Sequence, residues 1–263
     1  MKNNSFRSLV VLFCIVLFFW YFIYLASVSQ GRADKVLVAV AANFYNPFKE
    51  IAGQFEKKTG HQVEIISGST GKLYAQITNG APFEVFLAAD ARRPFLLEEE
   101  GKAVSGTRFT YALGKITLWS PNPNAILEDG KLILRQKKFT HISMANPITA
   151  PYGRAALQTL KNIELWEEVQ PYVVQGENIS QTFQFVFSQN AELGFVALSQ
   201  VLDPKNYKKG SRWDIPRELY DPIKQDIVIL EKGKNNPGAM ALWKFLGDKW
   251  AQQIIKKYGY GLP

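Results

Sequence analysis

The stretch 67–90, SGSTGKLYAQITNGAPFEVFLAAD, constrains the fold more than any other part of the sequence. A glycine-rich loop of small hydroxyl residues leads into apolar residues at helical spacing, so we expect a helix to begin near Gly71. The continuous apolar run at 85–89 is typical of a strand that is covered on both faces. A hydroxyl-rich loop ahead of a helix offers O–H and free N–H donors, which suits an anion.

Two other interpretations of this loop have to be weighed. Ser69 or Thr70 could serve only as the N-cap of the helix, which is an ordinary role for either residue type. The string GSTGK also resembles a nucleotide-binding loop, but that pattern needs four residues between its glycines and Ser or Thr after the Lys. Here two residues separate the glycines and Leu73 follows the Lys, so the nucleotide loop is excluded and the N-cap remains open.

Residues 1–34 have the layout of a secretory signal. A basic start precedes an apolar run at 9–26, and a short polar segment with small residues allows cleavage after Ala33. The run is also long enough to span a bilayer, so an uncleaved membrane anchor remains the alternative. We expect a periplasmic protein, exported by this segment. The single cysteine, Cys14, lies inside the run, so the exported part has neither a disulfide nor a thiol nucleophile.

The charge balance does not favour nucleic acid as a partner. The whole chain has 31 basic and 23 acidic residues, a formal net charge of +8. Without Lys2, Arg7, Arg32 and Asp34 the exported part keeps 28 basic and 22 acidic residues. These charges are interspersed, and no basic run with interleaved aromatic residues is present, so we expect no binding to nucleic acid.

The remaining chain alternates predicted strands and helices. Strands are expected at 35–42, 62–66, 85–89, 111–120, 142–145, 172–174, 191–197 and 226–230, with 199–220 polar and irregular. The pattern is a βαβαβ unit with a second one inserted into it, and the chain crosses between them near residues 114 and 222. We therefore expect two α/β lobes with a ligand cleft between them: 35–113 plus 222–263 as lobe 1, and 114–221 as lobe 2.

Four predicted strand-to-helix turns carry neutral hydrogen-bond donors. They contain Asn43, Ser69 with Thr70, Tyr152, and the segment 177–180. In an open parallel sheet such turns meet at the carboxyl edge of the strands. Neutral donors suit a fully ionised oxyanion, and each hydrogen bond to a charged group contributes about 1.5–3 kcal/mol. The coincidence of these turns favours an anion site over a set of unrelated caps.

The same cleft offers little for catalysis. His61 and His141 are the only histidines, and each is interpreted as a surface or structural residue. The sequence has no Gly-x-Ser-x-Gly elbow and no side chains at metal-ligand spacing. Asp90, at the end of a strand, is interpreted as a cap or loop staple. We expect neither an enzyme nor a cofactor.

Motifs throughout residues 35–263 resemble one family. They include VAVAANF at 38–44, GAPFEVFLAAD at 80–90, APYGRAA at 150–156 and AELGFVALSQV at 191–201, and they occur in the family's order. On these motifs the chain resembles the periplasmic molybdate-binding proteins of ABC importers, which have the type II solute-binding fold. The resemblance implies molybdate or tungstate as the ligand, no cofactor, and a membrane permease as the partner. We expect a monomer.

The resemblance also implies a set of ligand-binding residues. In that family neutral hydroxyls and main-chain amides bind the tetrahedral dianion. Carried over by motif, the molybdate contacts come from Asn43, Thr70, Tyr152 and the backbone amide of Ile179. Ala42, Ser69 and the amide of Ala89 are expected to assist.

Three alternatives stay open. The first is a receptor for another small oxyanion, such as sulfate or phosphate, because cavity size cannot be read from the sequence. The second is an enzyme built on the same two-lobed fold, although no reactive group is found. The third is a membrane-tethered sensor, for which the length of the run at 9–26 is the only support.

Overall fold

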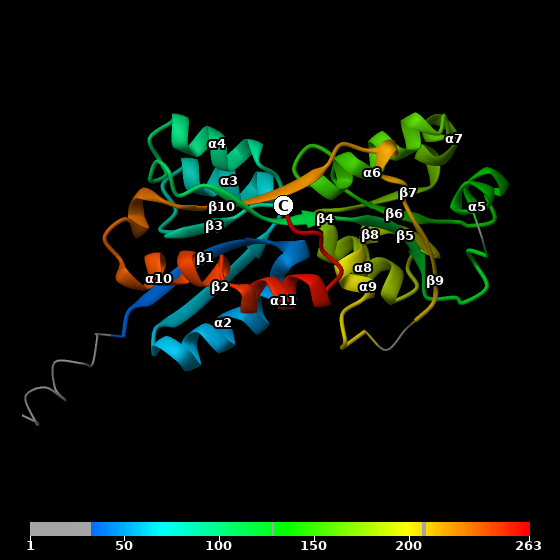
Figure 1. The fold of residues 1–263 in the computed structure, drawn as a ribbon. Coiled ribbons are helices and arrows are strands. Elements are labelled where there is room, and N and C mark those ends of the chain that lie inside the picture. The colour runs from blue at the N-terminus through cyan, green and yellow to red at the C-terminus, as the bar shows by residue number, and fades with distance from the viewer. Residues whose placement is uncertain (1–32, 128, 207–208) are drawn as a thin grey trace, which may run out of the picture. The chain divides into compact units, whose positions relative to one another are not determined.

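The strands of the protein fall into two mixed five-stranded sheets (Figure 1). This computed structural model describes residues 33–127, 129–206 and 209–263, and residues 34–263 form one compact unit. The predicted signal or anchor run at 9–26 lies outside the described residues. Across the ranges that are described, no helix combines the length and the apolarity needed to cross a bilayer.

The first sheet has the strand order β2-β1-β3-β10-β4. Its strands are β1 (Lys35–Ala41), β2 (Gln62–Gly68), β3 (Val85–Leu87), β4 (Phe109–Gly114) and β10 (Ile223–Ile229). The first three are parallel, whereas β10 runs antiparallel to both β3 and β4. The 3-10 helix η1 (Ala42–Phe44) and the helices α2 (Tyr45–Thr59), α3 (Thr70–Thr78), α4 (Arg92–Glu99), α10 (Pro237–Leu246) and α11 (Lys249–Lys257) accompany it. We call this group the first lobe.

The second sheet has the order β7-β6-β8-β5-β9. Its strands are β5 (Ile116–Ser120), β6 (Ile142–Ala145), β7 (Val173–Gly176), β8 (Leu193–Ala197) and β9 (Ser211–Asp214). Strands β6, β7 and β8 are parallel, and β5 is antiparallel to β8 and β9. The second lobe also contains α5 (Gly130–Gln136), α6 (Pro151–Asn162), α7 (Trp166–Val169), α8 (Ile179–Phe187) and α9 (Leu198–Val201).

The chain passes between the sheets at the two predicted places. Strand β4 ends at Gly114 in the first sheet, and β5 begins at Ile116 in the second. The return leads from the second lobe into β10, which starts at Ile223. These two sheets and two crossings confirm the predicted α/β fold with two lobes.

Each lobe has its own apolar core. In the first lobe, Phe44, Phe48 and Ile51 of η1 and α2 are fully buried against the strands. In the second lobe, Leu118, Ile142 and Phe195 of three adjacent strands are fully buried. Burial of this kind contributes about 1.5–3 kcal/mol for each large side chain, and it fixes the positions of the strand ends that carry the polar turns.

The structure corrects several sequence predictions. The sheets are mixed rather than purely parallel, and the segment 199–220, expected to be irregular, contains α9 and β9. Strand β9 alternates half-buried and exposed residues at the edge of its sheet, so it lacks the apolar run that marks a buried strand. Tyr172 lies in the 3-10 helix η2 (Gln170–Tyr172), and the strand begins one residue later than Tyr172. Helix α5 was not predicted.

Candidate functional site

All seven predicted ligand-binding residues line one small cavity between the lobes. Ala42, Asn43, Ser69, Thr70 and Ala89 come from the first lobe, and Tyr152 and Ile179 come from the second. The cavity is tight, with a volume of about 10 Å³, which is about the space that one water molecule needs. The structure brings the predicted residues together; their contacts with a ligand remain a prediction.

Four helix N-termini meet at this cavity. Helix η1 begins at Ala42, α3 at Thr70, α6 at Pro151 and α8 at Ile179, and all four residues line it. The first N–H groups of a helix have no partner within that helix, and the helix dipole places partial positive charge there. The cavity is therefore electropositive without a cation, as an anion site requires.

Ser69 carries the clearest sign of a missing partner. It occupies the N-cap position of α3, but its side chain makes no capping hydrogen bond. Its Oγ is buried and has no hydrogen-bond partner among the described residues, and the residue is only 3% exposed. An unsatisfied buried hydroxyl costs about 1–3 kcal/mol. The interpretation of Ser69 as a simple N-cap is wrong, and its position in the lining fits a ligand contact.

Thr70 and Ala89 interact with each other at the cavity wall. The Ala89 amide, expected to bind the anion directly, instead donates to Thr70 Oγ1 at 3.0 Å. Thr70 is 1% exposed, so this bond fixes a buried hydroxyl in place. Because Oγ1 accepts from Ala89, the hydroxyl proton is left to be donated elsewhere. The Ala89 amide thus orients the Thr70 hydroxyl, and it is not free to donate to an anion.

The start of α8 leaves one amide for the cavity. Asn178 is its N-cap, and Asn178 Oδ1 accepts from the amides of Ser180 at 2.9 Å and Gln181 at 3.1 Å. Those bonds satisfy two donors of the first turn. The amide of Ile179, between the cap and those two residues, is the one that the cap does not use.

Asn43 lies against the cavity with its side-chain donors already engaged. Asn43 Nδ2 donates to Gln225 Oε1 at 2.7 Å and to the Tyr260 hydroxyl at 3.0 Å. An amide nitrogen has two hydrogens, so both are used. The donor that Asn43 can offer to a ligand in this geometry is its backbone amide, at the start of η1.

Tyr152 extends from α6 toward the first lobe. Its hydroxyl lies 3.4 Å from Gln225 Nε2 of β10, and it packs so closely on Gly114 that a Cβ there would overlap it. Burial raises the pKa of Tyr152 well above its ordinary value. The phenol is therefore a neutral donor throughout the physiological range.

No charged side chain is found among the described residues that line the cavity. The nearby cations are paired with carboxylates: Lys72 forms an ion pair with Glu177, and Arg154 Nη2 lies 3.7 Å from Asp90 Oδ2. Asp90 also accepts the Arg93 amide at 2.9 Å, which fits its predicted role as a cap or loop staple. The donors that line the cavity are therefore neutral.

The lobes also touch through their backbones beside the cavity. The Gly71 amide donates to the Thr149 carbonyl at 2.8 Å, and a Cβ at Gly71 would lie 2.9 Å from Thr149 Cα. Ser180 Oγ donates to the Ala42 carbonyl at 3.1 Å. These contacts join the two lobes in a closed arrangement around the cavity.

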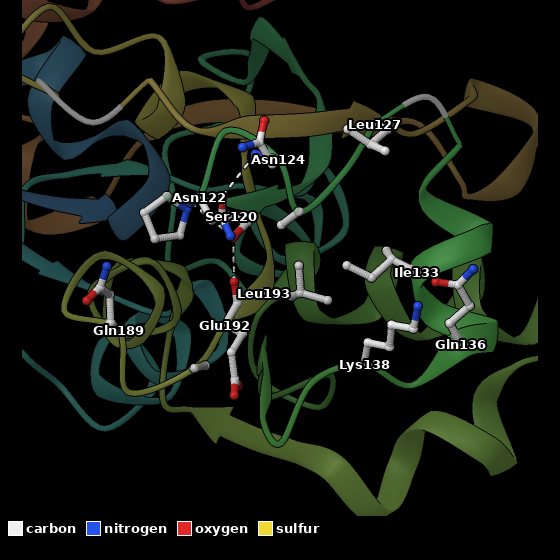
Figure 2. Close-up of a pocket in the computed structure, with 13 residues that line it drawn as sticks. Ser120, Asn122, Asn124, Leu127, Ile133, Gln136, Lys138, Gln189, Glu192 and Leu193 are labelled. Atoms are coloured by element: carbon white, nitrogen blue, oxygen red, sulfur yellow. Dashed lines mark hydrogen bonds between the residues drawn. The ribbon is translucent and has the colours of Figure 1, made fainter.

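A larger cavity lies in the second lobe, away from the predicted residues (Figure 2). It measures about 610 Å³ and is lined by residues such as Ser120, Asn122 and Glu192. Its buried polar groups have partners: Ser120 Oγ donates to the Glu192 carbonyl at 2.7 Å, and the Glu192 carboxylate accepts the amides of Thr140 and His141. None of the seven predicted ligand-binding residues lines this cavity.

Metal chemistry and histidine chemistry find no support in the geometry. Within the described ranges, no cluster of His, Cys, Asp and Glu could hold a metal ion. His61 Nδ1 accepts the Asp34 amide at 3.1 Å, and the ring stacks on Phe55, which fits the structural role predicted for it. What the cavity can do is bind a small anion.

Sequence reasoning missed several residues at the site. Ala41, Gly68, Ala150, Pro151 and Asn178 also line the cavity. The last could have been found from the sequence, because an Asn ahead of a helix is a standard N-cap signal. Behind the lining, Gln225 and Tyr260 contact Asn43, and no local signal marked either one.

Comparisons with known proteins identify the family. The family model described as bacterial extracellular solute-binding protein matches residues 36–261. The molybdate-binding protein ModA of Azotobacter vinelandii is 54% identical over 232 residues, which cover 88% of this chain and 92% of that protein. ModA of Rhodobacter capsulatus is 46% identical over 230 residues, covering 88% and 89%. The solved structure of the Azotobacter vinelandii periplasmic molybdate-binding protein has a TM-score of 0.83 at 40% identity, covering 87% of this chain and 99% of that one.

Proposed function

Because the chain belongs to the family of bacterial extracellular solute-binding proteins, we propose that it is the periplasmic molybdate-binding component of an ABC importer. It takes molybdate from the periplasm and delivers it to a membrane permease. It is a transport protein and not an enzyme. Tungstate is an equal guest, because the two dianions have nearly the same shape and hydrogen bonds cannot separate them.

The buried, unpaired hydroxyl of Ser69 is the observation that carries this proposal. It lies in a cavity at which four helices begin and whose described lining has no charged side chain. Ser69, Thr70, Tyr152 and the amides at Asn43 and Ile179 supply the hydrogen bonds. About five bonds to a dianion, less the cost of removing its water, are sufficient for micromolar or tighter binding.

The lobe boundaries and the assembly state are part of the proposal. Residues 35–113 with 222–263 form lobe 1, residues 114–221 form lobe 2, and one chain binds one anion as a monomer. The amino-terminal segment directs export, with cleavage after Ala33. Edman sequencing of the protein recovered from the periplasmic fraction tests the last point: a new terminus at Asp34 supports cleavage, and an intact Met1 supports a membrane tether.

Calorimetric titration tests the ligand. The full chain is expressed, the exported protein is purified, and it is titrated in parallel with molybdate, tungstate, sulfate and phosphate. We expect tight binding of the first two and at least about 100-fold weaker binding of the others, a difference of about 2.7 kcal/mol. Tight binding of sulfate or phosphate would keep the fold and overturn the ligand. If none of the four binds, the transport role itself is wrong.

A further inference from the structure

Gln225 lies at the centre of a buried polar cluster behind the cavity. It is fully buried on β10. Its Oε1 accepts from Asn43 Nδ2 at 2.7 Å and from the Tyr111 hydroxyl at 3.2 Å, and its Nε2 donates to the Tyr152 hydroxyl at 3.4 Å. One side chain outside the cavity lining thus contacts a residue of the anion site in each lobe.

We propose that Gln225 is the positioning residue that sets the direction of the hydrogen bonds at the anion site. It does so by holding Asn43 through its acceptor end and Tyr152 through its donor end. The inference rests on the proposed function. It assigns Gln225 no contact with the anion: Gln225 acts on the residues that bind it.

The amide group has the property that this position needs. It is neutral, and it presents an acceptor and a donor at fixed places. Because Nε2 donates to the Tyr152 oxygen, the Tyr152 proton is kept from pointing at Gln225 and stays available for other acceptors. A carboxylate at the same place has acceptors only. It would draw the Tyr152 proton toward itself and reverse the bond.

Asn43 is held at the same time from a second direction. The Tyr260 hydroxyl lies 2.8 Å from the Asn43 carbonyl and 2.9 Å from Ser199 Oγ. With the Asn43 side chain bound to Gln225, the start of η1 is fixed at both its side chain and its main chain. The η1 amides are thereby held toward the cavity.

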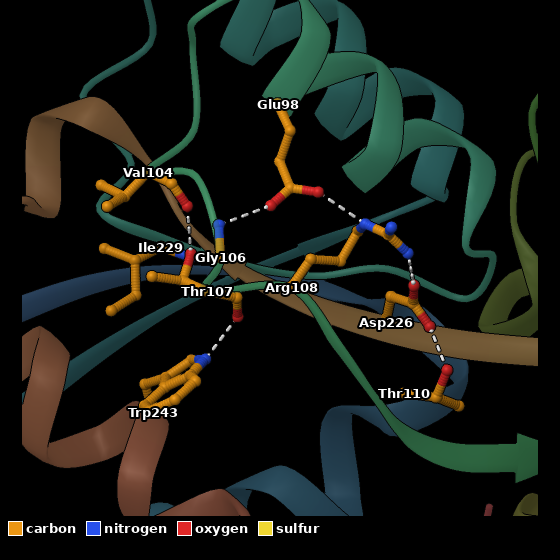
Figure 3. A network of polar contacts seen from close by, with 9 residues as sticks. All are labelled: Glu98, Val104, Gly106, Thr107, Arg108, Thr110, Asp226, Ile229 and Trp243. Carbon is orange, nitrogen blue, oxygen red and sulfur yellow. Dashed lines mark hydrogen bonds and ion pairs between the residues drawn. The ribbon is translucent and has the colours of Figure 1, made fainter.

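The groups that face Gln225 are neutral. Burial raises the pKa of Tyr111 and of Tyr152 well above the ordinary value, and burial also raises the pKa of Tyr260 to about 12. The neighbouring residue, Asp226, forms its contacts elsewhere: its carboxylate binds Arg108 at 3.0 Å and Thr110 at 2.7 Å (Figure 3). The ion pairs of Asp226 and the neutral cluster of Gln225 are thus made by adjacent residues of one strand.

The test is the affinity of Gln225→Glu for molybdate as a function of pH. A carboxyl group buried among neutral partners has a raised pKa, above its ordinary value of about 4.3. Below that raised pKa the protonated acid keeps one acceptor and one donor, as Gln does. Above it the carboxylate reverses the Tyr152 bond and places a charge behind a dianion. We expect affinity within about tenfold of wild type near pH 6, and at least about 100-fold weaker near pH 9.

Two further proteins make the result specific. Lys224→Glu also adds a carboxylate, on an exposed residue of the same strand, and it should bind like wild type at every pH. Gln225→Met keeps the size of the side chain and removes all three of these hydrogen bonds, so its affinity for molybdate should be about 10-fold or more weaker, with no dependence on pH. Titration of wild type at each pH removes any effect of the ligand's own protonation.

The outcomes distinguish failure of the proposed molybdate-binding function from failure of the positioning role of Gln225. If wild type does not bind molybdate at any pH, the proposed function fails. If wild type binds and Gln225→Glu follows it across the whole pH range, Gln225 has no positioning role. If Gln225→Glu does not fold at high pH, Gln225→Met decides, and wild-type affinity in that variant overturns the inference.

Discussion

The hydroxyl oxygen of Thr70 accepts the backbone N–H of Ala89 at 3.0 Å, across the wall of the cavity. This bond uses an acceptor of the hydroxyl and leaves its proton for a ligand. It also links the first residue of α3 to the segment that follows strand β3, and the two bonded residues are 19 apart in the chain. One bond therefore serves both the fold and the site.

Replacement of Thr70 by Val removes that hydroxyl at nearly constant volume. The molybdate complex should weaken by about 1–3 kcal/mol because one oxygen of the dianion loses its donor. The free protein should also lose stability, because the Ala89 amide becomes unpaired. Thr70→Ser, which keeps the hydroxyl, is the matched control. Calorimetry and urea unfolding check both effects, and an unchanged affinity would remove Thr70 from the site.

Replacement of Ser69 by Ala should keep or raise the stability of the ligand-free protein and lower its affinity for molybdate. The Ser69 hydroxyl is buried without a partner, so its removal should leave the ligand-free protein as stable as wild type or more stable, by up to about 1–3 kcal/mol. The affinity for molybdate should fall by a similar amount. Denaturant unfolding without ligand measures the change in stability, and calorimetric titration with molybdate measures the change in affinity. A loss of stability in the ligand-free protein would contradict it.

Molybdate affinity should depend little on salt. The cavity is lined by neutral groups, and the cations Lys72 and Arg154 are paired with carboxylates. Titration from about 10 mM to 150 mM ionic strength, over which the Debye length falls from about 30 to 8 Å, should change the dissociation constant by less than about threefold. A steep dependence would instead identify Lys72 or Arg154 as a direct ligand, and Lys72→Gln and Arg154→Gln would show which.

A methyl group at Gly114 should displace the Tyr152 side chain that lines the cavity. A Cβ there would overlap the Tyr152 hydroxyl, so Gly114→Ala should displace Tyr152 and weaken molybdate binding by about tenfold or more. Gly53→Ala in α2 is the control, because an added Cβ there meets nothing within 4 Å. That control should keep wild-type affinity and gain up to about 1 kcal/mol of stability. Equal affinity in the two variants would show that molybdate binding does not depend on the position of Tyr152.

The pH dependence of the wild type follows from its buried tyrosines. Burial raises the pKa of Tyr152, and it raises the pKa of Tyr260 to about 12. Both groups are neutral in the folded protein below those values, so affinity should be flat from about pH 7 to 9. Their contribution to stability is complete below the unfolded pKa of about 10 and is lost as the pH rises through the folded values. Unfolding measured from pH 8 to 12 should show stability falling only above about pH 10.

The sequence allowed the lining of the cavity to be predicted because its signals are local. A strand end followed by a polar turn and a helix is visible at Asn43, at Ser69 and Thr70, and at Tyr152, and the rule for parallel strands brings such turns together. The direction of the Asn43 side chain was not predictable. It depends on Gln225 and Tyr260, which are 182 and 217 residues away in the chain.

The mixed character of the sheets was missed for a similar reason. Only the second half of strand β10, residues 227–229, is an apolar run, and a run of that kind does not tell whether its neighbours are parallel or antiparallel. Its antiparallel pairing with β3 and β4 follows from the crossing back to the first lobe. That crossing is also what brings Gln225 behind the cavity.

The contact between Gly71 and Thr149 gives the protein a mechanical stop. Main chain meets main chain there at 2.8 Å, so the lobes cannot approach further whatever occupies the space beside them. The smallest separation between the lobes is therefore set by the backbone at Gly71 and Thr149, and not by side chains. An anion too small to fill the cavity at that separation cannot gain contacts by further closure of the lobes. Any side chain introduced at Gly71 would meet Thr149 and hold the lobes further apart.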